Sequence, residues 1–369
     1  MKRLTVLGVV LLAWLWGTGA WPEDHDRGAV YRRVNLVSDI AGVARFPDAN
    51  LVNPWGLAFG PTSPFWVANN SSGVSTLYNG RGQAFPVAAP LVVTIPSPTD
   101  PTGGGTPTGL VFNSTTDFVV SAHSQSGAAL FLFATEDGTL VGWSPTVNRT
   151  QAILAVDNSA AGAVYKGLAL ASTSQGIFLY VTNFHAGVVE MYDKDFQPVK
   201  TFTDPDVDPH FAPFGIQNIG GQLYVTFAKQ KLPDLHDDDA GPGNGFIDVF
   251  DPDGTLRRQF AAHGPLNSPW GLALAPDGFG LFSHHLLVGN FGDGRINAFD
   301  VDRGEFESPL LDPEGNPLTI NGLWALQFGN DAPNGGSSDR LFFTAGIADE
   351  AHGLFGFIRA GQAKDDKEE

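Results

Sequence analysis

Short apolar-rich runs separated by turn-forming residues make up most of this 369-residue chain. The runs 286–290 and 295–300 show the pattern, and the turn-forming segment Gly292-Asp293-Gly294 lies between them. β-Branched and aromatic residues dominate such runs, as is typical of half-buried strands joined by tight turns. The pattern therefore predicts an all-β chain of many short strands.

A longer repeat is superimposed on these strands. A small or Pro residue, then Gly, then an apolar run recurs six times, at intervals of 48 to 58 residues. A period of this length corresponds to a unit of a few strands that cannot bury its apolar face alone. Six such units predict a six-bladed β-propeller of four-stranded blades. The central residues of the six copies are Gly56, Gly109, Gly167, Gly215, Gly271 and Ala325.

The two ends of the repeat indicate how the ring closes. The segment 31–37 precedes the first copy and resembles the last strand of a blade, whereas the sixth copy ends after its third strand, at 354–358. We therefore expect the N-terminal strand to complete the last blade, which removes an open sheet edge. The first strand of each unit should lie closest to the axis, where its glycine allows close backbone approach.

The N-terminus has the pattern of a secretory signal. Lys2 and Arg3 precede an apolar stretch at 4–16 and small residues at 18–20, so we expect cleavage after residue 20. An uncleaved anchor is the alternative. The expected organisation is a signal peptide at 1–20, a flexible segment at 21–30, one propeller at 31–360 and a disordered charged tail at 361–369. The protein would then be secreted or periplasmic, and its mature chain would have no membrane span.

Composition narrows the partners and cofactors. The chain has 39 acidic and 21 basic residues and a net charge of −18, which disfavours nucleic acid as a partner. The absence of cysteine excludes thiolate metal sites and attached c-type haem. None of the repeat glycines opens a helix after a strand, so no nucleotide site is expected.

The predicted topology brings the ends of the second strands to one rim of the channel. Asn, carboxylate and imidazole groups together suit a divalent metal such as Ca, Zn, Mn or Cu. The alternative is that the Asn side chains cap strand ends by bonding to local backbone. The expected strand ends are Asn69, His123, Asn183, Phe227, Asn290 and Ala345. The candidate metal ligands are Asn69, His123, Asn183 and Asn290, with Asp238 and His352.

The longest loop, 229–245, joins two strands of the fourth unit and carries an acidic run with a histidine. Long structured insertions are often working loops, although a solvated acidic loop is the alternative. We expect His236 of this loop, together with His185 and Asp293, to bind a ligand. The tryptophans that recur at the repeat entries are expected to pack between blades rather than line the channel mouth. No catalytic residue is predicted, because the chain has neither G-x-S-x-G nor H-E-x-x-H.

Several segments carry a resemblance to known families. Residues 179–183 (Leu-Tyr-Val-Thr-Asn) resemble the YVTN propeller repeat, and 287–290 followed by 294–296 resemble the NHL repeat. Over residues 30 to 358 the chain resembles a family of conserved hypothetical bacterial secreted β-propellers, some of which end in PEP-CTERM sorting signals. It is more distantly similar to gluconolactonase-type six-bladed propellers, which hold a divalent ion in the channel with Glu, Asn and Asp ligands. The phrases shared with the bacterial family are those at 53–57, 236–245, 268–273 and 289–294.

Three functions are compatible with these features. The first is a secreted propeller that binds a polar small molecule or a protein or cell-surface partner at one face of the channel, through a divalent metal. The second is a metal-dependent extracytoplasmic enzyme, a lactonase-like hydrolase, lyase or oxidoreductase, that uses the same site. The third is a structural surface protein. A propeller fold hosts all three.

Overall fold

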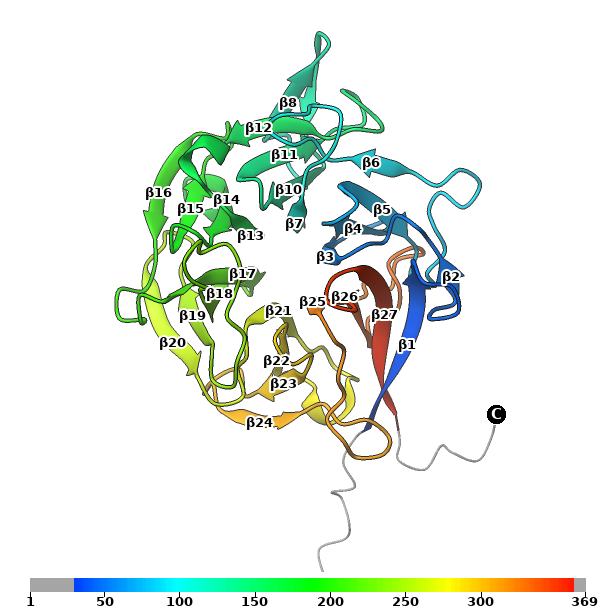
Figure 1. Ribbon diagram of the computed structural model, residues 1–369, viewed down its shortest axis with the longest axis vertical. Coiled ribbons are helices and arrows are strands. Elements are labelled where there is room, and N and C mark those ends of the chain that lie inside the picture. The colour runs from blue at the N-terminus through cyan, green and yellow to red at the C-terminus, as the bar shows by residue number, and fades with distance from the viewer. Residues whose placement is uncertain (1–29, 362–369) are drawn as a thin grey trace, which may run out of the picture.

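The computed structural model describes residues 30–361, which form a ring of six antiparallel sheets around a central channel (Figure 1). The predicted signal peptide and most of the predicted tail lie outside the described residues. Helix is confined to two short 3-10 turns in the described range, η1 (Ser159–Ala161) and η2 (Gly280–Phe282). No helix within residues 30–361 is long and apolar enough to cross a membrane. The six-bladed propeller predicted from the repeat is therefore confirmed.

The strands of each blade follow one another from the channel outwards. Blade 1 is β3 (Pro54–Ala58), β4 (Phe65–Asn69), β5 (Val74–Tyr78) and β6 (Val92–Thr94); blade 2 is β7 (Pro107–Phe112), β10 (Phe131–Thr135), β11 (Thr139–Trp143) and β12 (Ile153–Asp157). Blade 3 is β13 (Tyr165–Thr173), β14 (Gly176–Asn183), β15 (Val188–Tyr192) and β16 (Pro198–Phe202); blade 4 is β17 (Phe211–Ile219), β18 (Gln222–Lys229), β19 (Phe246–Phe250) and β20 (Leu256–Ala262). Blade 5 is β21 (Pro269–Leu274), β22 (Leu286–Asn290), β23 (Ile296–Phe299) and β24 (Phe306–Pro309). Blade 6 is β25 (Leu323–Phe328), β26 (Arg340–Ile347), β27 (His352–Gly361), β1 (Val30–Ser38) and β2 (Phe46–Pro47).

The N-terminal strand closes the ring, as the sequence predicts. β1 pairs antiparallel with β27 from Val30↔Gly361 to Ser38↔Leu354, and Figure 1 shows the two strands side by side. β1 also contacts blade 5, because the hydroxyl of Tyr31 donates to the carbonyl of Phe279 at 3.0 Å. The first and last segments of the described chain thus share one sheet, which leaves no unpaired blade edge at the seam.

The inner strands approach one another closely at the repeat glycines. A Cβ atom on Gly215 would lie 2.2 Å from the carbonyl oxygen of Trp270, and one on Gly271 would lie 2.3 Å from that of Trp324. A Cβ on Gly56 would lie 2.3 Å from the carbonyl oxygen of Thr108. In each case the neighbour is backbone of the next inner strand, which cannot move without displacing a blade. The glycines are therefore required by ring closure.

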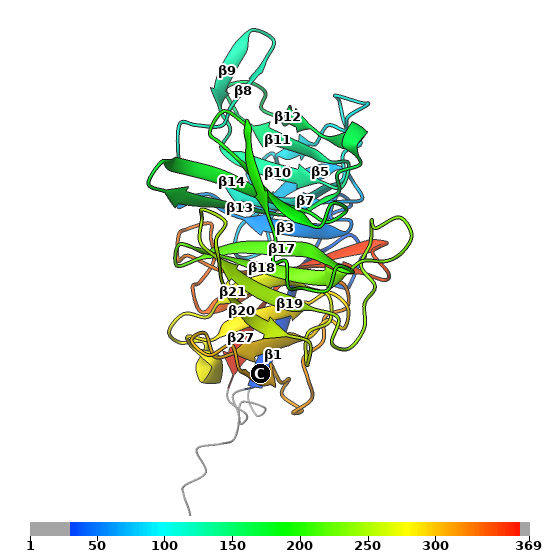
Figure 2. The same ribbon diagram turned by 90° about the vertical axis from the view of Figure 1, so that its left-hand side faces the viewer.

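Blade 2 differs from the prediction. The segment that the sequence suggested as its second strand, ending at His123, instead forms a separate hairpin of β8 (Val119–Ala122) and β9 (Gln125–Ala128). This hairpin projects beyond the ring (Figure 2). The true second strand is β10, whose last residue, Thr135, pairs with Pro107 at the start of β7. Because β8 and β9 lie between β7 and β10 in the sequence, counting strands from the repeat glycine identified β8 instead of β10 as the second strand.

The close inner-strand packing makes a testable prediction. Gly215→Ala should lower the free energy of unfolding by about 1 to 3 kcal/mol, because its Cβ would overlap a fixed carbonyl. Urea unfolding monitored by tryptophan fluorescence measures this loss. The matched control is Gly103→Ala, where an added Cβ meets only a Thr94 methyl at 3.3 Å. Equal stability of the two variants would contradict the account of the hub.

Candidate functional site

One rim of the channel gathers the starts of the inner strands and the ends of the second strands. The paired residues occupy the same register in every blade: Pro54↔Asn69, Pro107↔Thr135, Tyr165↔Asn183, Pro213↔Phe227, Pro269↔Asn290 and Leu323↔Ala345. Asn69, Asn183 and Asn290 end their strands as predicted, whereas β18 and β26 each run two residues beyond Phe227 and Ala345. Thr135 takes the place that the sequence assigned to His123. The loops that leave these strand ends lie over the channel mouth.

Aromatic side chains fill the channel just inside this rim. The rings of Trp55 and Trp324 stack with centroids 3.4 Å apart, and Trp270 meets both edge-on at 6.2 and 5.7 Å. All three are at least nine-tenths buried. Trp55 and Trp270 belong to blades 1 and 5, which are not neighbours, so the rings meet across the channel rather than only between blades as predicted. The Trp324 indole donates to Asn53 Oδ1 at 3.2 Å, whereas no partner is found for the indole nitrogens of Trp55 and Trp270 within residues 30–361.

A lysine stands among these aromatic residues. Lys166 is only 2% exposed, on the inner strand β13. Its ammonium contacts the carboxylate of Glu136 and lies 5.0 Å from the Trp55 ring centroid and 5.8 Å from that of Phe184. Because a buried ammonium is costly unless it is paired, the carboxylate and the two ring faces together stabilise its charge.

Glu136 reaches Lys166 from the neighbouring blade. It directly follows β10, and its second oxygen accepts a hydrogen bond from Asn70 Nδ2 at 2.7 Å. Asn70 in turn follows Asn69, the strand end of blade 1. Glu136 therefore joins blades 1, 2 and 3 at the rim.

The long loop of blade 4 adds a histidine and an aspartate to this group. His236 Nδ1 lies 2.9 Å from Asp237 Oδ1. This contact raises the pKa of His236 and lowers that of Asp237, because each charge stabilises the other. One ligand-capable atom each from Glu136, His236 and Asp237 lie within 4.8 Å of one another. These atoms come from two blades and converge above Lys166.

Two further carboxyl groups face the same centre. Asp238 Oδ2 is buried and has no hydrogen-bond partner among the described residues. Burial raises the pKa of Asp238, although Ser268 and the charge of Lys166 oppose the rise. Glu350 accepts a hydrogen bond from Asn53 Nδ2 at 2.6 Å, and burial likewise raises its pKa. We call the group of Glu136, Lys166, His236, Asp237, Asp238 and Glu350 the rim centre.

A cleft of about 420 Å³ opens beside the rim centre, between the loops of blades 5 and 6. The carboxylates of Asp293, Asp349 and Glu350 line it, and Phe291 lies at its base, stacked on Trp324 at 4.1 Å. Ala348, Asp349 and Glu350 all have positive φ, from 52° to 64°. Three consecutive non-glycine residues in this region are unusual, and such backbone strain concentrates at functional sites.

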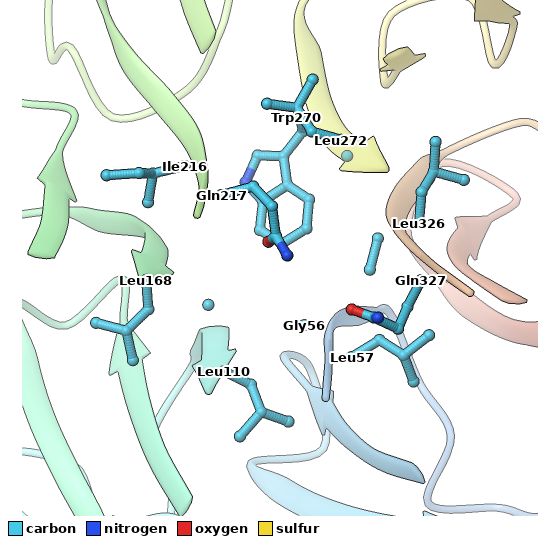
Figure 3. Close-up of a pocket in the computed structure, with 13 residues that line it drawn as sticks. Gly56, Leu57, Leu110, Leu168, Ile216, Gln217, Trp270, Leu272, Leu326 and Gln327 are labelled. Carbon is cyan, nitrogen blue, oxygen red and sulfur yellow. The ribbon is translucent and has the colours of Figure 1, made fainter. Parts of the chain in front are cut away.

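The channel below the aromatic layer is different in character. Six apolar residues, one from each blade, surround it, but their side chains belong to the buried clusters between the blades, whereas those of Gln217 and Gln327 reach into it (Figure 3). The space there is about 30 Å³, room for about one or two waters. None of the residues that line it is titratable, so the titratable groups are at the rim. The six apolar residues are Leu57, Leu110, Leu168, Ile216, Leu272 and Leu326.

The predicted asparagine ligands have partners inside their own blades. Asn69 donates to Thr76 at 2.9 Å, and Asn183 donates to Glu190 at 2.7 Å. Asn290 donates to the carbonyl of Pro265 at 2.8 Å. Thus these side chains tie the second strand of a blade to the turn that follows it or to an adjacent loop. The side-chain oxygens of Asn69 and Asn290 are buried and have no partner among the described residues, so a metal at the asparagines stays a prediction.

The predicted histidines and acids divide into two groups. His236 and Asp238 belong to the rim centre, and Asp293 lines the adjacent cleft. His123 is exposed at the tip of the β8–β9 hairpin, and His185 is exposed after β14. His352 Nδ1 lies 2.6 Å from Asp39 Oδ2 of the connection after β1. These three are not part of the rim centre.

The donor set of the rim centre fits a divalent cation. Ligand atoms that lie about 2 Å from a common ion are at most about 4 Å apart. The atoms of Glu136, His236 and Asp237 lie within 4.8 Å of one another, so a small inward movement of the side chains would let them share one ion. The unpartnered oxygen of Asp238 is a further acceptor at this centre. One imidazole with carboxylates suits zinc or manganese better than calcium.

Comparison with known proteins places the chain among relatives of undetermined function. No protein-family model matches it. Two uncharacterised proteins of Acanthamoeba polyphaga mimivirus are each 33% identical to it, and the alignments cover 91% of this chain and 82% and 88% of theirs. Because these relatives are viral, the resemblance to bacterial secreted propellers stays a prediction.

Solved structures share the fold at low sequence identity. Virginiamycin B lyase from Staphylococcus aureus has a TM-score of 0.52 at 12% identity, covering 90% of this chain and 99% of that one. A streptogramin B lyase has a TM-score of 0.53 at 12% identity, covering 90% and 98%. A luciferin-regenerating enzyme has a TM-score of 0.50 at 12% identity, covering 90% and 95%. At this identity the likeness shows the propeller fold alone.

The buried Lys166–Glu136 contact makes a second prediction. Glu136→Gln should destabilise the protein by about 3 kcal/mol, because it leaves a buried ammonium without its counter-ion. The double variant Glu136→Gln/Lys166→Met should lose less than the sum of the two single losses. Thermal and urea unfolding of the four proteins measure the coupling. Strictly additive losses would mean that the two charges do not stabilise each other.

Proposed function

The chain belongs to the same family as the two mimivirus proteins, and we propose that it binds a divalent cation at the rim centre and, through it, a polar ligand. The observation that carries the proposal is the convergence of Glu136, His236 and Asp237 within 4.8 Å. Glu136 follows β10 of blade 2, whereas His236 and Asp237 are neighbours in the loop after β18 of blade 4, so local chain geometry does not account for the meeting of these two segments. The ring brings them together at the open end of the channel.

The surrounding charges support a cation at this position. Three carboxyl groups, of Asp237, Asp238 and Glu350, accompany Glu136. Among the residues of the rim centre, Lys166 alone opposes a cation, and the four acids outnumber it. Burial raises the pKa of both Asp238 and Glu350, because loss of solvent disfavours the ionised carboxylate. A divalent cation would favour their ionised forms.

The adjacent cleft is where the ligand would lie. It is large enough for a small polar molecule, and Glu350 belongs to both the cleft and the rim centre. A ligand there would complete the coordination of the cation with its own oxygen atoms, as in other sites where protein groups leave positions open. A small molecule or the tip of a protein or cell-surface partner would satisfy this geometry. A location outside the cytoplasm is part of the proposal and rests on the sequence of residues 1–20.

A metal-dependent enzyme is the second candidate, and one observation favours it. Burial raises the pKa values of Asp238 and Glu350 beside the candidate cation site, so either would hold a proton to a higher pH than an exposed acid and could act as a proton donor. A cation at this position polarises a carbonyl or activates water. Hydrolysis of a lactone, a lyase reaction or oxidative chemistry would each use this arrangement.

Metal binding tests the first proposal directly. Isothermal titration with Mn²⁺ and with Zn²⁺ should give about one site per chain, and His236→Ala should weaken binding at least tenfold. The matched control is His210→Ala, because His210 also lies 2.8 Å from an aspartate, Asp208, but has no third ligand nearby among the described residues. Equal binding by wild type and His236→Ala would place the cation elsewhere, and no binding by the wild type would contradict the proposal.

The pH dependence of the same titration is a further prediction. Metal binds the neutral imidazole, so protons compete for His236. Since the contact with Asp237 raises the pKa of His236, Mn²⁺ affinity should begin to fall at a higher pH than an unperturbed histidine, of pKa about 6.5, would give. Affinity that stays constant between pH 8 and pH 5.5 would exclude His236 as a ligand.

A further inference from the structure

A carboxyl group without partners lies between blades 3 and 4, away from the rim centre. Asp248 is on β19, where Phe246, Asp248 and Phe250 alternate onto one face of the strand. Phe246 and Phe250 belong to the apolar cluster between these two blades. Asp248 therefore occupies a position in the pattern that a core residue would normally take.

Asp248 is fully buried, and neither of its carboxylate oxygens has a hydrogen-bond partner among the described residues. Its neighbour is Asp204, which follows β16 of blade 3 and is 5% exposed. Asp204 already uses one oxygen to accept a hydrogen bond from the amide of Asp206, at 2.8 Å. Two buried carboxyl groups thus face each other across a blade junction.

No positive charge compensates this pair among residues 30–361. Val225 of β18 and Gln259 of β20 lie opposite Asp248 in the sheet. Asp204 is the one charged group that acts on it. The other charged groups of the neighbouring elements either bind another residue or are exposed to solvent. Glu190 accepts hydrogen bonds from Tyr165 and Tyr192, Lys229 pairs with Asp239, and Arg257 pairs with Asp251. Arg258 donates to the carbonyls of Val301 and Asp302, and Lys200, Asp206 and Asp208 are exposed.

Two ionised carboxylates in contact, without donors and in apolar surroundings, are strongly unfavourable. One proton shared between them removes one charge and supplies the missing hydrogen-bond donor. We propose that Asp204 and Asp248 form a proton-binding site at the junction of blades 3 and 4, and that loss of this proton loosens the junction. The site is independent of the cation proposed at the rim.

The direction of the pH effect follows from the same contacts. Burial, and next the charge of Asp204, raise the pKa of Asp248 to about 8, whereas an unfolded aspartate titrates near about 3.9. The folded chain therefore holds one proton more than the unfolded chain between these values. The contribution of the pair to stability is fully present below about pH 4 and is lost as the pH rises through about 8.

The test compares unfolding across this pH range in wild type and Asp248→Asn. The asparagine amide is neutral and can donate to Asp204, so it should replace the protonated acid. The ratio of the two unfolding equilibrium constants, wild type over variant, should rise about tenfold per pH unit between pH 5 and pH 7.5. The control is Asp206→Asn, because Asp206 is an exposed neighbour. Its unfolding equilibrium constant should change with pH as that of the wild type does.

A second readout keeps the proposal testable if Asp248→Asn does not fold. Infrared difference spectra of the wild type should show the carbonyl band of a buried protonated carboxyl at pH 6 that is lost at pH 9.5, and Asp204→Asn should change it. The proposal would be overturned if the stabilities of wild type and Asp248→Asn changed equally with pH, or if no such infrared band were seen. Stability that depends on added CaCl₂ and not on pH would also overturn it, because the pair would then be a cation site.

Discussion

Pairing of β1 with β27 is the interaction on which the rest of the structure depends. It joins the two ends of the described chain in one sheet, from Val30↔Gly361 to Ser38↔Leu354, and so fixes the circumference of the ring. Once the ring is closed, the inner strands have no freedom to spread, and the backbone of each approaches the next at the repeat glycines. Loops from different blades, which are distant in sequence, are then held close together at one rim of the channel.

The hub gives the two ends of the channel different chemistry. Trp55, Trp270 and Trp324 fill it near the rim, and below them Gln217 and Gln327 reach into a narrow space whose lining has no titratable group. Lys166 lies at the boundary, where its ammonium contacts Glu136 and the Trp55 ring. The aromatic layer therefore forms the floor of the rim centre and limits the solvent that reaches it, which strengthens the electrostatic contacts there.

The sequence predicted the fold well because the repeat is a physical requirement of the ring. Each glycine stands where a Cβ would overlap the next blade, and the N-terminal segment carries the missing outer strand. The same reasoning located Asn69, Asn183 and Asn290 at the rim. Their side-chain partners were not predictable, because Thr76 and Glu190 become neighbours only through the strand register.

The site was only partly predictable. His236 and Asp238 stood out in a long acidic loop, whereas Glu136 was hidden because the β8–β9 insertion made His123 appear to end the second strand. The run 131–135, followed by Glu136 and the turn residues Asp137 and Gly138, was the available signal. No sequence signal identified Lys166 as a site residue, because the carboxylate and aromatic rings that surround it belong to other parts of the ring and are distant in sequence.

The central claim is that the closed ring assembles a cation site above Lys166. Anomalous diffraction from a crystal soaked in Mn²⁺ tests it most directly, because it locates the ion without reference to any activity. The account predicts one strong peak about 2.2 Å from ligand atoms of Glu136, His236 and Asp237. A peak found only beside surface carboxylates would contradict it. So would a peak coordinated by Asn69, Asn183 and Asn290, the residues at the ends of second strands.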